Sequence, residues 1–209
     1  MWLSIFSAVV LGVPLLAGCV DPEGRLNEFV SRVPDAKVVI MYDAPPLNEI
    51  PDITGTFLLA IHVAATGNAL PLQSLATVAL TKSGATATAN FHIQYLTAQH
   101  DPAQTGDRLP IDGATLDENN IAVTSAGEFD IVVGTLTVPM VANPLGFAAT
   151  AENVHLIGTI KSTDLFCGTL TGDITSPTPL PLAGSTFGAV RVTAGQTGDQ
   201  LPQPTIKCP

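Results

Sequence analysis

Histidine and glutamine side chains on two predicted strands are the first candidates for chemistry. His62 lies in an alternating run over residues 55–65, and His92 and Gln94 lie in a second alternating run over 86–98. If these strands lay together, the three side chains could line a small polar pocket or a transition-metal site. No His-x-His or His-x-x-His spacing accompanies them, and a further strand-like run separates the two in sequence. We therefore favour ordinary surface histidines and expect no metal site.

The polar segment 99–120 is a second candidate, because it is rich in oxygen ligands. These are of the hard kind that calcium prefers, and they are Asp107, Asp112, Asp117, Glu118 and Asn119. Their spacing does not match the short calcium-binding loop in which acidic residues alternate around a fixed glycine. The segment is therefore expected to be a long solvated loop.

Nucleophilic and acid–base catalysis find little support in the sequence. The Gly-x-Ser-x-Gly pattern is absent, and the serines beside glycines lie in predicted turns without an identifiable His and Asp partner. Asp130 and Asp173 fall within strand patterns, where a water-facing strand side explains both. We expect no catalytic residues and no cofactor, and hence a protein that is not an enzyme.

Charge and composition exclude further classes. The chain has 18 acidic and 8 basic residues, so its formal net charge is −10. A field of that sign repels phosphate backbones, so nucleic acid is not an expected partner. The sole tryptophan, Trp2, lies in the amino-terminal apolar run, which disfavours a carbohydrate-stacking site in the rest of the chain.

The amino terminus carries an apolar run that ends at a cysteine. Residues 2–18 contain no charged side chain, and the run is short for a membrane span, so it indicates a signal peptide over residues 1–18. The segment Leu16-Ala17-Gly18-Cys19 resembles the lipobox of bacterial lipoproteins. This resemblance implies cleavage between Gly18 and Cys19 and acylation of Cys19. No Lys or Arg precedes the run, which departs from the usual signal-peptide pattern.

The lipobox resemblance also implies where the protein resides. Acyl chains on Cys19 would make the membrane a partner and hold the protein in the cell envelope. In lipoproteins of some Gram-negative bacteria, an Asp directly after the lipidated cysteine favours the inner membrane. Val20 occupies that position here, which favours a location in the outer membrane.

Once Cys19 is set aside for acylation, Cys167 and Cys208 remain. An even number of cysteines in an exported protein favours a disulfide, which would tie the carboxyl terminus to a central segment. Two separate buried thiols are the alternative. A metal site is less favoured, because neither cysteine has a Cys or His at short spacing.

The remaining sequence predicts a tether, a β-domain and a tail. Residues 19–50 form the predicted tether, with one short helix whose apolar residues are spaced helically after Pro22. Residues 51–193 alternate with period two between turn residues, which indicates eight or nine short strands in an antiparallel β-sandwich or small β-barrel. Residues 194–209 are expected to be an extended carboxyl-terminal tail, unstructured unless Cys208 pins it.

Two functions from different classes fit these features. The first is a non-catalytic, lipid-anchored envelope lipoprotein whose β-domain has a structural role or contacts another envelope protein. The second is a lipocalin-like carrier, in which a closed barrel holds a small apolar ligand in its lumen. The Gly-x-Trp signature associated with lipocalins is absent. The chain as a whole resembles Gram-negative lipoproteins in which a lipobox precedes a Thr-, Gly- and Val-rich β-domain.

Overall fold

The computed structural model describes residues 49–67, 70–98 and 108–209. The predicted signal peptide, Cys19 and the predicted tether helix lie outside these described residues. Within the described residues no helix is long and apolar enough to cross a membrane. The helical elements found there are three single 3-10 turns, namely η1 (Ala64–Thr66), η2 (Met140–Ala142) and η3 (Gly198–Gln200).

The described part of the chain folds into strands, as its period-two alternation predicts. In β3, for example, Phe91, Ile93 and Tyr95 are buried while the residues between them are less buried. Nine strands are described: β1 (Gly55–His62), β2 (Leu72–Ser83), β3 (Thr86–Leu96), β4 (Pro110–Val123), β5 (Glu128–Val138), β6 (Ala149–Ser162), β7 (Leu165–Ser176), β8 (Leu180–Pro181) and β9 (Thr186–Arg191).

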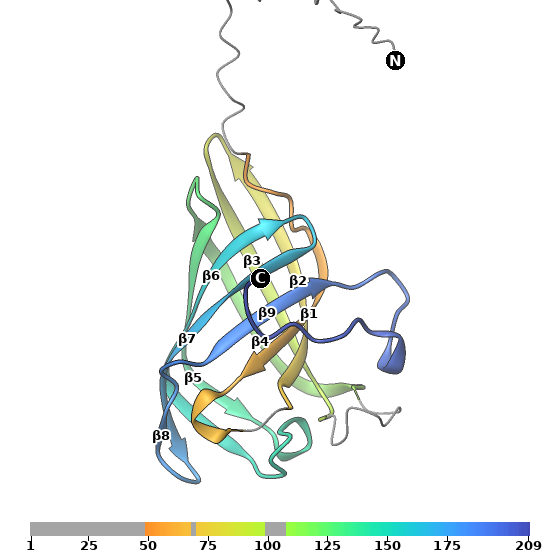
Figure 1. Cartoon of the computed structure of the whole chain (residues 1–209). Helices are drawn as coiled ribbons and strands as arrows, with labels where there is room; N and C mark the ends of the chain where they lie inside the picture. Colours follow the sequence, from red (N-terminus) through yellow and green to blue (C-terminus); the bar gives the residue numbers. More distant parts are fainter. Residues whose placement is uncertain (1–48, 68–69, 99–107) are drawn as a thin grey trace, which may run out of the picture. The chain divides into compact units, whose positions relative to one another are not determined.

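Eight of these strands close into an antiparallel barrel (Figure 1). The strands follow one another around the wall from β1 to β7, and β9 completes it by pairing with both β7 and β1. The short β8 pairs with β7 as an additional strand. Of the two predicted architectures, the chain therefore adopts the barrel. Closure pairs every strand of the wall on both sides, which removes open sheet edges.

The barrel has two distinguishable ends. At the hairpin end, short turns join β2 to β3, β4 to β5 and β6 to β7. At the opposite end, which we call the pocket end, longer loops join β1 to β2, β3 to β4, β5 to β6, and β7 through β8 to β9. The chain enters β1 from the hairpin end, because Gly55 pairs with Val78 in the half of β2 nearer that hairpin.

Strand β4 corrects the expectation of a long loop over 99–120. The strand begins at Pro110 and pairs with β3 along its length, with register shifts on the way. A bulge beside Asn120, whose φ is 59°, breaks the period-two pattern, and the apolar side chains of β4 before Val123 are at most partly buried. These features explain why this part of the sequence lacks the alternating pattern that predicts a strand.

The barrel interior is filled by aromatic rings toward the hairpin end. Phe57, Phe91, Phe129 and Phe166 come from four different strands, and their ring centroids lie 5.0–6.0 Å apart in contacting pairs. Gly158 makes room for this packing, because a Cβ there would lie 2.4 Å from the Phe129 ring. This half of the barrel is therefore a packed core and offers no lumen.

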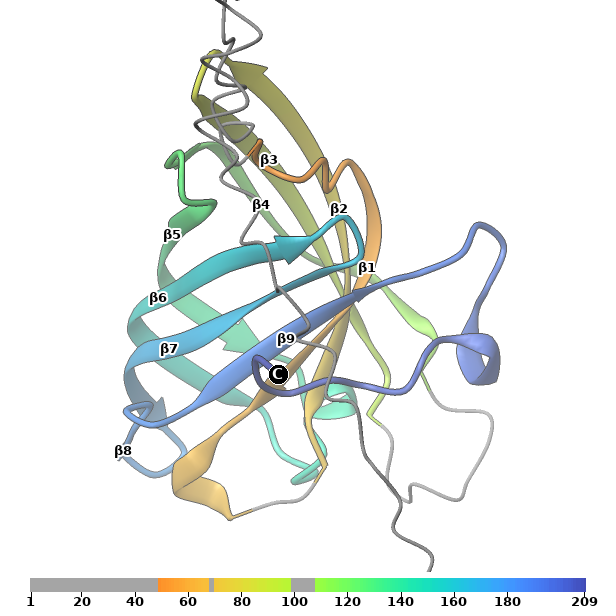
Figure 2. The ribbon, with the colours of Figure 1, turned by 45° about the horizontal axis from the view of Figure 1, so that its top comes forward.

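The carboxyl-terminal tail crosses the outside of the barrel over β9 (Figure 2). The disulfide between Cys167 and Cys208 is present, with a Cα–Cα distance of 5.3 Å, as the cysteine count favoured. The buried Arg108 donates hydrogen bonds to the main-chain carbonyls of Leu201 and Pro202, each at 3.0 Å. The predicted extended tail is therefore held at two places.

Candidate functional site

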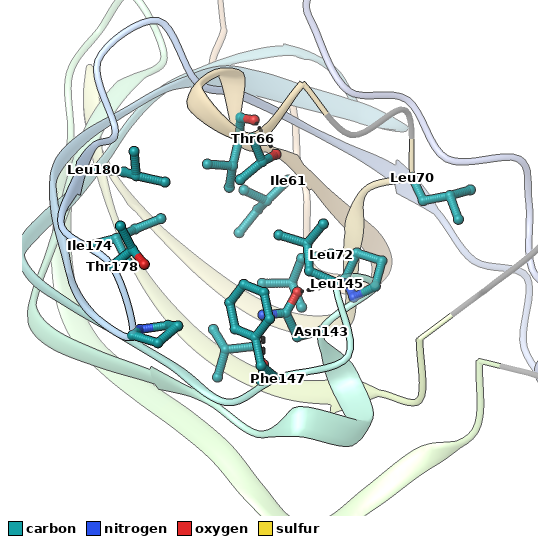
Figure 3. A pocket seen from close by; sticks show the side chains of 14 residues that line it. Ile61, Thr66, Leu70, Leu72, Asn143, Leu145, Phe147, Ile174, Thr178 and Leu180 are labelled. Carbon is teal, nitrogen blue, oxygen red and sulfur yellow. Dashed lines mark hydrogen bonds between the residues drawn. The ribbon is translucent and has the colours of Figure 1, made fainter.

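An apolar pocket of about 340 Å³ opens at the pocket end of the barrel. Its wall is formed by strand residues whose side chains point inward below the loops, among them Ile61, Leu72 and Ile174 (Figure 3). Loop residues surround the opening, and Leu145 and Phe147 face Thr178 and Leu180 across it. The remaining lining residues are Val63, Thr66, Leu70, Val138, Asn143, Pro144 and Pro177.

The loop between β5 and β6, residues 139–148, forms one side of the pocket, and we call it the rim loop. Asn143 holds its shape: the side-chain Nδ2 donates to the carbonyl oxygen of Phe147 at 2.8 Å, and Oδ1 accepts from the amide of Leu145 at 3.0 Å. One buried side chain thus fixes the two apolar residues that face the pocket. The loop is also tied to the barrel, because the amide of Ala98 donates to the carbonyl of Val141.

The opposite side of the pocket is fixed through a buried serine. The Ser185 side chain is 0% exposed, and its Oγ accepts a hydrogen bond from the amide of Ala64 at 3.1 Å. The carbonyl of Ser185 accepts from the amide of Leu170, and its amide donates to Leu182. These bonds tie the β1–β2 loop to the segment before β9, so hydrogen bonds within the protein hold both sides of the opening.

The lining contains no ionisable group. All fourteen lining residues come from three segments, 53–81, 131–151 and 174–190, and none of these contains an Asp, Glu, Lys or Arg. The polar groups of Thr66, Thr178 and Asn143 are the exceptions to an otherwise apolar surface. Such a site has no charge to pair with an ionised ligand, and it favours a neutral, largely apolar molecule.

The structure does not bring together the residues proposed for a polar pocket or metal site. His62 lies at the pocket end of β1, whereas His92 pairs with Thr77 in the middle of β2, with that strand between them. His92 Nδ1 instead lies 2.6 Å from Asp117 Oδ1 on the barrel exterior, and Gln94 donates to the carbonyl of Ile111. Across residues 49–67, 70–98 and 108–209, no group of three potential ligand residues gathers.

The acidic residues once considered for calcium are dispersed along β4. Asp107 lies outside the described residues, and Asp112, Asp117 and Glu118 belong to the strand. Burial, together with the neighbouring Asp117 carboxylate, raises the pKa of Glu118 above its usual value. Asp130 pairs with His155 Nδ1 at 3.1 Å on the outer face of β5 and β6, while Asp173 is exposed on β7.

The sequence alone marks none of the pocket residues as part of a binding site. The signals that could have indicated the rim loop are the uncharged stretch 131–151 and the turn-forming dipeptide Asn143-Pro144 within it. The alternating pattern alone cannot separate residues that fill a barrel from those that line a cavity, because both face inward.

Comparison with known proteins gives no relative from which a role could be carried over: no protein-family model, curated protein or solved structure matches the chain.

Proposed function

We propose that the protein is a non-catalytic binding protein that holds a small, neutral, apolar molecule at the pocket end of its barrel. The observation that carries this proposal is the pocket itself, which is concave, apolar, uncharged and bounded by loops that hydrogen bonds within the protein hold in place. A pre-formed site of this kind needs little ordering on binding, which favours affinity.

The volume sets the ligand size. A dry apolar cavity of about 150 Å³ holds benzene, so the 340 Å³ pocket has room for roughly a dozen non-hydrogen atoms. At about −0.5 kcal/mol per atom, within the range seen for small ligands, the binding free energy is about −6 kcal/mol. That free energy corresponds to a dissociation constant of tens of micromolar.

Lipid anchoring is the second part of the proposal. The apolar run over residues 2–18 and the segment Leu16-Ala17-Gly18-Cys19 support it, and the disulfide agrees with export to an oxidising compartment. We propose that the acylated Cys19 holds the binding domain in the envelope, with the outer membrane as the favoured location. Replacing Cys19 with Ser should leave a precursor that no longer partitions into detergent; unchanged partitioning would contradict the anchor.

Titration with a neutral fluorescent probe tests the binding function. N-phenyl-1-naphthylamine gains fluorescence in apolar surroundings. It has 17 non-hydrogen atoms, about five more than the estimated ligand, and the open mouth of the pocket leaves space for the excess. We expect saturable binding to the protein, with at least a tenfold loss in Leu180→Arg, which places a charge in the lining. Ile157→Arg is the matched control, because Ile157 is 45% exposed on the outer wall and does not line the pocket. Equal binding by both variants would contradict the proposal.

A further inference from the structure

The rim loop exposes apolar side chains that the pocket does not use. Met140 and Val141 are 58% and 51% exposed and do not belong to the pocket lining. Leu145 and Phe147 belong to the lining and are nevertheless each 39% exposed. Exposed apolar residues scattered singly are ordinary, but four within one short loop form a patch that indicates a contact surface.

The rim loop satisfies several of its backbone polar groups by hydrogen bonds within the loop. The amides of Ala142 and Asn143 donate to the carbonyl of Pro139, and the amide of Gly146 donates to the carbonyl of Asn143. The Asn143 side chain bonds Leu145 and Phe147, as described above. A loop that enters the edge of a bilayer loses water partners, so hydrogen bonds made within the loop lower the free energy needed for insertion.

Charge is distributed so that this part of the barrel can approach a lipid surface. Three of the four loops at the pocket end lie in the uncharged segments 53–81, 131–151 and 174–190. Asp52, Lys82, Glu128, Lys161, Asp164 and Arg191 lie at the hairpin end, whereas Asp112, Glu152 and Asp173 lie on strands close to the pocket end, outside these three loops. The rim loop itself carries no charged residue, so its insertion dehydrates no ionised side chain of that loop.

We propose that the rim loop docks on a lipid bilayer, inserting Met140 and Val141 into its interfacial region, so that the pocket exchanges its ligand with the membrane. The exchange step rests on the proposed function, whereas the docking does not. An anchor at Cys19 permits this orientation: the roughly 30 residues from there to Glu49 span up to about 100 Å when extended, at about 3.3 Å per residue. That length exceeds the roughly 48 Å of the longest strands, β4 and β6 with 14 residues each.

Quenching of an introduced tryptophan by brominated phosphatidylcholine tests the docking. Two variants of the full chain, Met140→Trp and Ile157→Trp, are each reconstituted in phosphatidylcholine vesicles. Each variant is measured with and without the brominated lipid. Ile157 is the matched control, because it is also an exposed apolar residue but lies on the outer wall. Cleavage after Gly18 removes Trp2, and in any uncleaved chain the Trp2 signal is common to both variants and is subtracted with the unsubstituted protein. We expect at least threefold more quenching at position 140; equal quenching would overturn the proposal.

A second substitution separates docking from ligand binding. Val141→Asp in the Met140→Trp chain should lower quenching to the control level, because a carboxylate resists insertion. In the original chain, Val141→Asp should leave the affinity for N-phenyl-1-naphthylamine within twofold, since Val141 does not line the pocket. Quenching that persists in Val141→Asp would overturn the docking. Quenching at position 140 in a protein that binds no probe would refute the proposed function and leave the docking standing.

Discussion

The guanidinium carbon of Arg191 lies 4.7 Å from the centre of the Phe57 ring, at the hairpin end of the barrel. The same guanidinium donates to Asp164 Oδ1 at 2.8 Å and to the carbonyl of Thr54 at 3.0 Å. It also donates to the carbonyl of Thr163. Arg191 therefore joins the segment before β1 to the β6–β7 hairpin and covers the aromatic core.

Removing the Arg191 side chain should destabilise the barrel. We expect Arg191→Ala to lower the free energy of unfolding by about 2 to 3 kcal/mol, because the cation–π contact and several charged hydrogen bonds are lost together. Arg191→Lys should recover only part of this, since an ammonium cannot reproduce the planar fork. Urea unfolding measures the free energy of unfolding of both variants. The exposed Lys161, at the same end, is the control, and Lys161→Ala should change stability by less than about 0.5 kcal/mol. Equal effects of the two alanine variants would contradict the assigned role.

The disulfide should contribute strongly to stability because it closes a long loop. Cys167 and Cys208 are separated by 41 residues, which in the chain-entropy model corresponds to about 4 kcal/mol. Cys208→Ser should lower the free energy of unfolding by up to that amount, and reduction of the original chain should have the same effect. Tail cleavage at Lys207 by trypsin should become faster in the variant. An unchanged unfolding midpoint under reducing conditions would show that the tail adds no constraint.

Tyr95 should make the barrel sensitive to alkali. The side chain is 5% exposed, and burial raises the pKa of its phenol far above its ordinary value of 10.0. The unfolded chain therefore releases this proton near pH 10 while the folded chain retains it, so stability is lost as the pH rises above 10. The loss approaches about 1.4 kcal/mol per pH unit for one group. Between pH 10 and 11.5, Tyr95→Phe should lose stability less steeply than the original chain; parallel curves would contradict this assignment.

Much of the fold could be predicted from local alternation. Period two located β1 and β3 closely, because one face of each carries large apolar residues and turn residues bound both strands. The disulfide followed from counting cysteines once Cys19 was set aside. Closure into a barrel could not be predicted from the sequence, because it depends on the pairing of β9 with β1, which are more than a hundred residues apart. The strand signal at residues 121–124 located only the end of β4, and the part of the strand before it was missed because a bulge interrupts the alternation.

The candidate site was much less predictable. Ile61 and Ile174 alternate like Phe57 and Phe166, yet the first pair lines the pocket and the second fills the core. The difference arises because phenylalanine rings fill the barrel interior toward the hairpin end, where the missing side chain of Gly158 leaves room for Phe129. Both are properties of three-dimensional packing. His62 and His92 do not lie together, because β2 separates their strands, and the strand-like run between them had already made a shared site doubtful from the sequence.

Asn143 should determine whether the pocket keeps its shape. Asn143→Ala removes the bonds to Leu145 and Phe147, and we expect a probe affinity at least fivefold lower and a stability loss of about 1 to 2 kcal/mol. Asn143→Asp retains the acceptor for the Leu145 amide but lacks the donor to Phe147, so its affinity should be intermediate. Fluorescence titration and urea unfolding measure the two effects. Full affinity in Asn143→Ala would show that the rim loop does not depend on this side chain.

The most direct test of the binding site is isoleucine-methyl NMR of the protein titrated with N-phenyl-1-naphthylamine. Ile61 and Ile174 line the pocket, whereas Ile53 is fully buried elsewhere in the core and Ile157 lies exposed on the outer wall. If the pocket is the binding site, the methyl signals of Ile61 and Ile174 shift saturably, while those of Ile53 and Ile157 stay unchanged. Shifts centred on Ile157, or no shifts at saturating probe, would contradict the assignment of this pocket as a ligand site.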